Sequence, residues 1–191
     1  MRVNTPFLES ERLILKHGVF YDYRTVYEYD FTKLRDIAGE FEYKKLSDED
    51  IEGFDTYSLE CDDVYDWIVY LKDGKAIGNI TADRRNETNN SIELSFNLHP
   101  RYWGFGYIKE ACIVIMDYLF KQGYDNIMCG YSEGNIKSKK VNEKLGFSLY
   151  KVIENAWEKN GKPITDYQTI LSKENYFKLY QKKWGFREEC I

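Results

Sequence analysis

The sequence predicts an α/β domain whose front half is largely antiparallel. Its 191 residues are about one domain's worth of chain, on a prior of roughly 100–200 residues per domain. Strand-like segments follow one another between residues 64 and 98, and the Asp73-Gly74 turn favours a tight hairpin. From about residue 108 onward, helical stripes alternate with further strands. These observations together indicate the fold class.

The N-terminal third is expected to hold one strand and two helices. The strand is predicted over residues 13–15. Over residues 20–38, apolar side chains recur every three or four positions, which is the spacing of one helix face, and Gly39 offers a stop. A second helix is expected within residues 47–60, because Ser47 is followed three residues later by an acid, as in a capping box.

Three antiparallel strands are expected next, over residues 64–71, 76–84 and 91–98. The third of them alternates cleanly between apolar and polar side chains, and Glu93 and Asn97 belong to its polar face. This pattern is typical of a half-buried strand whose polar side faces a cleft.

The second half is expected to end in a hairpin and a helix. The predicted elements are a helix over about 108–123, a strand over 126–131, a helix over 135–145, a hairpin that pairs 148–157 with 163–171, and a terminal helix from about residue 173. No repeat, low-complexity tract or interdomain linker interrupts this series. We therefore expect one domain over residues 1–191, with residues 173–191 as a C-terminal helical extension.

Composition and charge exclude several classes of function. The 27 Lys and Arg against 32 Asp and Glu give a net charge of −5, which makes the chain a poor non-specific binder of nucleic acid. No apolar run approaches the roughly 18 residues of a membrane span, and the first residues form no apolar signal region. The cysteines show no CxxC spacing, and two histidines leave no metal cluster. We expect a cytoplasmic protein with no metal, membrane or nucleic-acid partner.

The segment between the third strand and the next helix carries the chemistry. Gly104 and Gly106 stand just before the helix, where glycines let the backbone approach a ligand closely. The free N–H groups of the helix's first turn favour an anion, and Arg101 could add a charge-assisted contact. The segment suits a pyrophosphate, with a plain turn as the alternative. A dinucleotide fingerprint does not fit, because Lys109 stands where the third glycine belongs.

Arg101-x-x-Gly104-x-Gly106 resembles the acyl-CoA signature of the GNAT superfamily of N-acetyltransferases. Three further blocks resemble the ribosomal-protein N-acetyltransferase (RimJ/RimL-like) branch of that superfamily. They are Leu8-Glu9-Ser10-Glu11-Arg12-Leu13-Ile14-Leu15, Tyr102-Trp103-Gly104-Phe105-Gly106-Tyr107 with Glu110-Ala111, and Asn135-Ile136-Lys137-Ser138 with Glu143-Lys144-Leu145-Gly146-Phe147. The resemblance covers about residues 8–171, with the blocks in the same order.

The resemblance implies a GNAT-type fold, in which helices flank a mixed, mostly antiparallel central sheet. It also implies direct transfer of acetyl from acetyl-CoA to a primary amine in a ternary complex. The diphosphate would lie across the N–H groups of residues 103–107, and Asn135 would face the pantetheine arm or the acetyl group. Backbone N–H groups near Asn97 and Leu98 would stabilise the oxyanion. The residues that the resemblance assigns to acetyl-CoA are Asn97, Leu98, Arg101, Trp103, Gly104, Phe105, Gly106, Tyr107, Asn135 and Ser138.

Two residues are candidates for proton transfer. An alkyl ammonium has a pKa of about 10 and must lose a proton before it attacks a thioester. Glu93 could take this proton directly or through water, and a solvated strand carboxylate is the alternative. Many superfamily members carry a Tyr that protonates the departing thiolate, but Asn142 stands at that place. Ser138 is predicted to replace this Tyr, with Tyr102 and Tyr131 in reserve.

The acceptor is predicted from the distribution of charge. Residues 36–66 hold twelve acids against two lysines, which is a local net charge of −10. Together with Tyr43 and Tyr57, this segment would attract a cationic amine by steering and cation–π contact. A solvated charged loop is the alternative. We expect the acceptor to be a peptide N-terminus or a small cationic amine.

A second class of function stays open. Without the usual Tyr, the chain could be a non-catalytic acyl-CoA-binding or regulatory domain of the same fold, and a homodimer is also left open. Release of CoA thiol with a suitable amine, depressed in Glu93→Gln, would distinguish an enzyme from such a domain.

Overall fold

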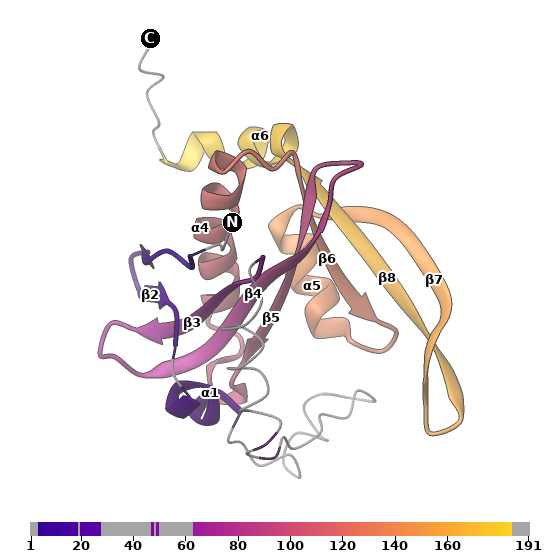
Figure 1. Ribbon diagram of the computed structural model, residues 1–191, viewed down its shortest axis with the longest axis horizontal. Coiled ribbons are helices and arrows are strands. Elements are labelled where there is room, and N and C mark those ends of the chain that lie inside the picture. Colours follow the sequence, from indigo (N-terminus) through magenta and orange to yellow (C-terminus); the bar gives the residue numbers. More distant parts are fainter. Residues whose placement is uncertain (1–3, 19, 28–46, 48, 50–62, 185–191) are drawn as a thin grey trace.

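An eight-stranded sheet with helices on both of its faces forms the fold (Figure 1). The computed structural model describes residues 4–18, 20–27, 47, 49 and 63–184. Within these residues the strand order is β1-β2-β3-β4-β5-β6-β8-β7. The strands are β1 (Leu8–Glu9), β2 (Leu13–Lys16), β3 (Tyr65–Leu71), β4 (Ala76–Asn86), β5 (Ser91–Leu98), β6 (Asn126–Ser132), β7 (Ser148–Lys159) and β8 (Lys162–Ser172).

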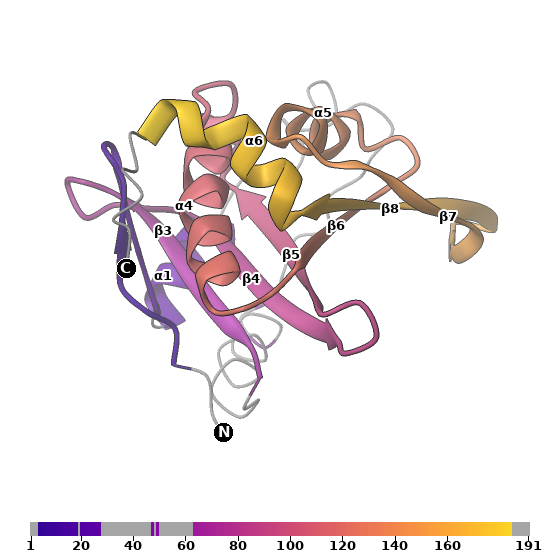
Figure 2. The same cartoon turned by 90° about the horizontal axis from the view of Figure 1, so that it is seen from above.

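The described helices connect and cover these strands. They are α1 (Phe20–Tyr27), the short 3₁₀ helix η2 (Pro100–Tyr102), α4 (Tyr107–Lys121), α5 (Ile136–Leu145) and α6 (Lys173–Trp184). Figure 2 shows α4 and α6 on one side of the sheet and α1 on the other. The short α1 therefore covers a face that α4 leaves open.

Strand β3 shows why the sheet needs cover on both faces. Successive side chains of a strand point to opposite faces. Trp67 and Val69 belong to the large core against α4, whereas Ile68 and Tyr70 belong to a second core that Tyr23 of α1 closes. All four of these β3 side chains are buried, so both faces of β3 are covered by other elements.

The fold class predicted from the sequence is confirmed. The sheet is mixed and mostly antiparallel, and β5 with β6 is its one parallel pair among the described residues. The strand predicted over 91–98 has those bounds, and β4 extends to Asn86, beyond the predicted end at residue 84. The two-residue β1 was not predicted, because so short a strand shows no alternation.

The helix predictions are confirmed in part. The helix expected over 108–123 begins at Tyr107 and ends at Lys121, where the Gln122 N–H caps the last turn. The helix expected over 20–38 is confirmed for α1 alone, and its remainder lies outside the described residues. Most of the helix expected within 47–60 also lies outside them.

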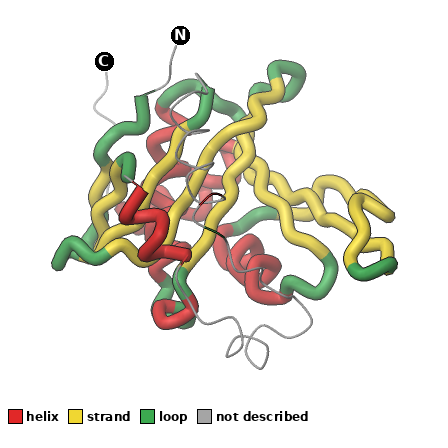
Figure 3. Tube along the Cα trace, turned by 60° about the horizontal axis from the view of Figure 1, so that its bottom comes forward, coloured by secondary structure: helices red, strands yellow, loops and turns green. Residues whose placement is uncertain are grey.

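Strands β5 and β6 separate halfway along their length. Their parallel pairing runs from Ser91 opposite Asn126 to Leu94 opposite Cys129 and then stops. Beyond that point β5 stays paired with β4, and β6 stays paired with β8. The two parts of the sheet therefore diverge, and the β7–β8 hairpin projects away from the other strands (Figure 3).

Candidate active site

A cavity of about 330 Å³ opens where β5 and β6 separate. Its walls come from β5, β6 and β8, from the start of α5 and from the irregular end of β4. The polar side chains on these walls include Arg84, Glu93, Ser132, Asn135, Ser138 and Asp166. A concave site with a few converging polar groups is the usual form of a small-molecule site.

The backbone of β5 offers hydrogen-bond donors to this opening. On the β4 side, His99 N–H donates to Ile77 O at 2.8 Å. Because alternate residues of a strand turn their N–H groups to the same side, the N–H of Leu98 faces the opening, whereas that of Asn97 faces β4. The amide nitrogen of the Asn97 side chain is buried and has no hydrogen-bond partner among the described residues.

The glycine-bearing loop joins β5 to α4. Gly104 has a φ of +87° and Gly106, at the N-cap of α4, has a φ of +81°. No heavy atom lies within 4 Å of a Cβ built at Gly104, so glycine is needed there for backbone conformation rather than for space. The first turn of α4 leaves its N–H groups without helical partners, which makes a site for an anion.

A charged brace holds this loop to the N-terminal strands. Glu110, in the first turn of α4, accepts hydrogen bonds from Ser10 Oγ at 2.7 Å and Arg12 Nε at 2.7 Å. Arg12 Nη1 also donates to Phe105 O at 3.1 Å. Burial raises the pKa of Glu110, but the hydrogen bonds from Ser10 and Arg12 outweigh it and hold that pKa below its usual value. The brace therefore keeps Glu110 charged and fixes the loop.

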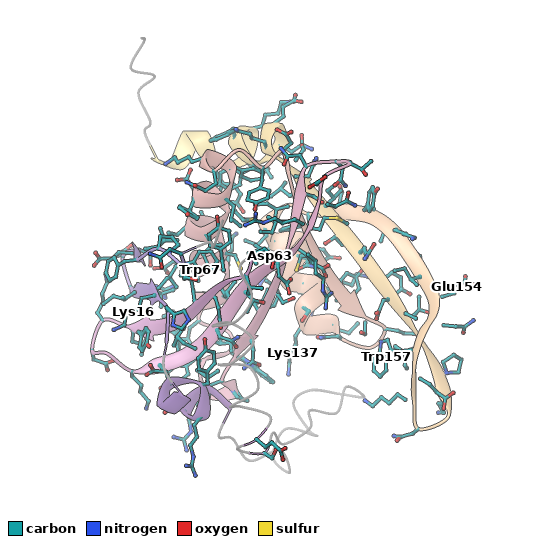
Figure 4. All side chains as sticks on the ribbon, in the orientation of Figure 1. Lys16, Asp63, Trp67, Lys137, Glu154 and Trp157 are labelled. Carbon is teal, nitrogen blue, oxygen red and sulfur yellow. The ribbon has the colours of Figure 1, made fainter. Side chains whose placement is uncertain are left out.

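The other loop residues assigned to acetyl-CoA lie around the end of β5. Trp103 Nε1 donates to Leu98 O at 2.8 Å, and Lys137 Nζ lies 3.8 Å from the centroid of the Trp103 ring. Lys137 projects from the first turn of α5 (Figure 4), and burial lowers its pKa. Phe105 is exposed and stacks on Tyr107 with ring centroids 5.9 Å apart. The loop and α5 thus meet at one end of the cavity.

Arg101 lies in η2, and its side chain is exposed. Its backbone N–H donates to His99 Nδ1 at 3.2 Å, which fixes the short helix. No ion pair of the Arg101 guanidinium is recorded within the described residues. The group is therefore available to an incoming anion.

Glu93 stands on the cavity wall, as its place on the polar face of β5 predicted. Its side chain is 19% exposed, and Arg84 Nη1 donates to its Oε2 at 3.4 Å. On the facing strand, a Cβ at Gly130 would lie 3.7 Å from Glu93 Oε1. The missing side chain at Gly130 therefore leaves room beside this carboxylate.

Asn135 and Ser138 line the cavity together from the start of α5. Asn135 is the N-cap, and its side-chain oxygen accepts from Ser138 N–H at 3.1 Å. The capping alternative for Asn135 is therefore confirmed, and its role toward acetyl-CoA stays a prediction. Tyr131, one of the reserves, also lines the cavity, whereas Tyr102 packs against His99 and Tyr107 in the loop.

Asn142 lies in the interior and does not line the cavity. It is 1% exposed, and its Nδ2 donates to Thr169 Oγ1 at 3.2 Å, which in turn donates to Cys129 O at 2.6 Å. This chain of hydrogen bonds ties α5 to β8 and β6. Asn142 therefore holds α5 to the sheet through its Nδ2, whereas its buried Oδ1 has no hydrogen-bond partner among the described residues.

Several functional candidates were not found from the sequence. Asp166 lines the cavity from β8 and accepts from Ser132 Oγ at 2.6 Å and Trp157 Nε1 at 3.1 Å. Tyr167 lines the cavity from the same strand and stacks on Tyr131, which the sequence already named as a reserve, with ring centroids 5.1 Å apart. These residues lie on the predicted hairpin and strand, but their convergence depends on the sheet order, which local periodicity does not encode.

The predicted acidic acceptor wall falls mostly outside the described residues, and so do Tyr43 and Tyr57. Asp66 is one of its acids that the structure describes. It is 2% exposed in β3 and accepts a hydrogen bond from Tyr23. Asp66 therefore belongs to the core under α1, and counting it in an acceptor-facing wall was wrong.

The sheet separates beside a glycine loop that begins a helix, and this places a cavity close to a helix N-terminus suited to an anion. The family model described as "Acetyltransferase (GNAT) domain" matches residues 12–148. The chain therefore belongs to the GNAT acetyltransferase domain family, and the resemblance to that superfamily is confirmed.

Sequence relatives cover part of the chain. An uncharacterized N-acetyltransferase of Schizosaccharomyces pombe is 31% identical over 94 residues, which are 49% of this chain and 47% of that protein. N-acetylaspartate synthetase of Xenopus tropicalis is 32% identical over 89 residues, or 46% of this chain and 32% of that protein. The chain thus matches about half or less of the length of these relatives.

Solved structures agree with the fold. A GCN5-related N-acetyltransferase from Brucella melitensis has a TM-score of 0.79 at 18% identity and covers 100% of this chain and 90% of its own. A ribosomal-protein-S5-alanine acetyltransferase from Vibrio fischeri has a TM-score of 0.70 at 23% identity. The match covers 90% of this chain and 98% of that protein's chain. At these identities the similarity supports the fold alone.

Two findings concern expected absences. In the described part of the chain, no helix combines the length and apolar character of a membrane span. Over the same residues, no group of three or more His, Cys, Asp or Glu side chains is arranged to hold a metal ion.

Proposed function

We propose that the chain transfers the acetyl group of acetyl-CoA directly to a primary amine while both substrates are bound. The cavity at the separation of β5 and β6 carries this proposal. It places a carboxylate, Glu93, on the strand whose far end, at Leu98, leads into the glycine loop. A base, an oxyanion donor and an anion site thus follow one another along a single stretch of chain.

The residues present fit acetyl-CoA. The positive-φ glycines and the unpaired N–H groups at the start of α4 suit its diphosphate, with Arg101 exposed nearby. The pantetheine arm would lie along the open edge of β5, between Leu98 and the α5 residues Asn135 and Ser138. An amide chain of this kind can pair with the backbone groups that β6 leaves unpaired.

The reaction follows from these positions. Glu93 takes a proton from the acceptor ammonium, and the neutral nitrogen attacks the thioester carbonyl carbon to form the C–N bond. The Leu98 N–H, which faces the opening, stabilises the oxyanion of the intermediate. The C–S bond then breaks and CoA leaves as a thiolate, for which the Ser138 hydroxyl is the candidate proton donor. Overall, the ammonium loses two protons, of which the thiolate gains one and solvent the other.

The protonated state of the cavity-lining thiol, Cys129, supports direct transfer. Cys129 lines the cavity, but burial raises the pKa of its thiol to about 12. The thiol form is a weak nucleophile, because the thiolate is the reactive species. An acetyl-cysteine intermediate is therefore not favoured, and a ternary complex is the simpler route.

The acceptor is proposed to be a peptide N-terminus or a small amine. The neighbour from Vibrio fischeri is described as a ribosomal-protein-S5-alanine acetyltransferase, so its named acceptor is an alanine of a protein. Membership in the ribosomal-protein branch, a cytoplasmic location and a homodimer remain predictions.

Glu93→Gln tests the proposal. Thiol release from acetyl-CoA is measured with a panel of amines and N-terminal peptides, and acetyl-CoA binding is measured separately by calorimetry. We expect kcat to fall by about 10²–10⁴-fold, the usual contribution of a general base, with little change in acetyl-CoA affinity. Glu154→Gln, on the exposed β7 strand (Figure 4), removes the same charge from a side chain that does not line the cavity and serves as the control.

The outcomes separate the two classes of function. Acetyl-CoA binding without thiol release across the whole panel would support a non-catalytic domain. Turnover that Glu93→Gln leaves intact would exclude Glu93 as the base while keeping the enzyme.

A further inference from the structure

Strand β4 carries an irregularity beside the cavity. Its pairing with β5 is regular up to Asp83 opposite Glu93, and the next pair is Asn86 opposite Ser91. One extra residue therefore stands on β4, which makes a bulge. Arg84 within it has a φ of +50°, a conformation that residues other than glycine seldom adopt. Bulges of this kind redirect side chains next to functional sites.

The bulge sends two consecutive arginines to different surroundings. Arg84 lines the cavity and reaches Glu93 Oε2 at 3.4 Å. Arg85 instead lies over the rings of Tyr65 and Tyr124, with its guanidinium carbon 5.9 and 5.8 Å from their centroids. Both rings belong to the core that α4 covers. The chain thus aims one guanidinium into the cavity and uses the other for packing.

The charged side chains that line the cavity are one guanidinium, Arg84, and two carboxylates, Glu93 and Asp166. Asp166 Oδ1 already accepts two hydrogen bonds, from Ser132 and Trp157. Glu93 and Arg84 share a single long hydrogen bond, and Asp83, opposite Glu93 on β4, is a further carboxyl group close to Arg84. The Arg84 side chain is 70% exposed, so this pair is easily opened by a ligand.

A simple cationic amine matches only half of this arrangement. Its ammonium would pair with Glu93, but the neighbouring guanidinium would repel it. An α-amino acid carries an ammonium and a carboxylate one carbon apart, and these match Glu93 and Arg84 at the same time. The planar fork of a guanidinium binds a carboxylate with two parallel hydrogen bonds, so Arg suits this role.

We propose that Arg84 binds the carboxylate of the acceptor, and that the acceptor is a free α-amino acid acetylated on its amine. This inference rests on the proposed function, because Glu93 must take the proton of that same amine. Arg84 is then a specificity-determining residue at the mouth of the cavity, and the β4 bulge is the device that aims it.

Matched acceptors test the inference. Steady-state thiol release is compared for the common L-amino acids and their carboxamides at saturating acetyl-CoA. The carboxamide lacks the anion and has the lower amine pKa, so without an Arg84 contact it would react faster. We expect the free acids to have the higher kcat/KM, by about tenfold or more, which corresponds to one charge-assisted contact of about 1.4 kcal/mol.

Variants of Arg84 complete the test. Arg84→Asn keeps a side chain that tolerates positive φ but removes the guanidinium, and it is expected to reduce the acid-to-amide ratio about tenfold. Arg84→Lys keeps the positive charge without the planar guanidinium. Its acid-to-amide ratio should lie between those of the wild type and Arg84→Asn. Arg85→Gln removes the same charge from the opposite face and should leave the ratio unchanged. Thermal unfolding of each variant confirms that it is folded.

Each result has a distinct meaning. Equal turnover of acids and amides, or a ratio that Arg84→Asn does not change, would overturn the inference while the acetyltransferase proposal stands. Absence of thiol release with every acceptor, in a protein that binds acetyl-CoA, would overturn both.

Discussion

At the scale of single residues, Glu110 shows a charge that serves the binding loop rather than the reaction. It accepts hydrogen bonds from Ser10 and from the backbone and side chain of Arg12, 98 positions away in sequence. Arg12 then holds Phe105 O of the loop. The two blocks of sequence that resemble one family thus have a physical reason to occur together, since one braces the other.

Glu110→Gln is expected to lower the free energy of unfolding by about 1–2 kcal/mol at neutral pH, since it weakens charge-assisted hydrogen bonds. The KM for acetyl-CoA should rise several-fold, because the loop loses its brace. The folded pKa of Glu110 lies below its usual value of 4.5, so the stabilisation is present above that value and is lost as the pH falls through the folded pKa. Urea denaturation of both proteins at a series of pH values measures this.

The difference in the free energy of unfolding between the wild type and Glu110→Gln should therefore disappear at acid pH. A difference that stays constant with pH would contradict this account. Glu143→Gln, an exposed carboxylate on α5, is the matched control.

Asn142 illustrates how a sequence position can mislead at this scale. Its alignment with a family Tyr points to proton transfer, but its side chain is buried against Thr169. Hydrogen bonding in the interior, rather than contact with a thiolate, accounts for an amide there. The proton donor must therefore come from another residue, such as Ser138 on the cavity wall.

At the scale of elements, the loop between β5 and α4 depends on backbone conformation. Gly104→Ala should cost about 1–2 kcal/mol, because an L side chain disfavours positive φ, and should weaken CoA binding. Gly104→Asn should retain most of the affinity, since Asn tolerates this region and the space is open. Calorimetric titration with CoA compares the three proteins. Equal losses for Ala and Asn would mean that the ligand needs the missing Cβ rather than the conformation.

The pairing of β5 explains why the site lies where it does. A strand held by neighbours on both sides has no free backbone groups to offer. The pairing of β5 with β6 ends at Leu94, so the last residues of β5 have unpaired backbone groups on that side. This free edge runs from Leu94 to the glycine loop. In the proposed reaction, β5 would supply both the carboxylate and the oxyanion donor.

At the scale of the whole molecule, ligand binding should change amide hydrogen exchange near the point where β5 and β6 separate. Saturating CoA is expected to slow amide hydrogen exchange in residues 95–107 and at the start of α5, because a ligand stabilises the segments that it contacts. The tip of the β7–β8 hairpin should not change. Mass spectrometry of exchange with and without CoA measures both, and protection confined to the hairpin would contradict the site.

Much of this molecule follows from local patterns. The alternation of β5 predicted its bounds and its polar face, and the glycines before α4 predicted the loop. The Asn160-Gly161 turn, with positive φ at both residues, joins β7 and β8 as the sequence predicted. Local periodicity works here because each pattern reflects the burial of a single element.

The sequence by itself determined the fold class, the order of the elements and the loop suited to a diphosphate. Only the tertiary structure decided where β5 leaves β6, which residues face the cavity and that Arg84 turns toward Glu93. The physical reason is that strand order and a one-residue bulge depend on pairings between distant segments, and these leave no trace in the periodicity of either strand.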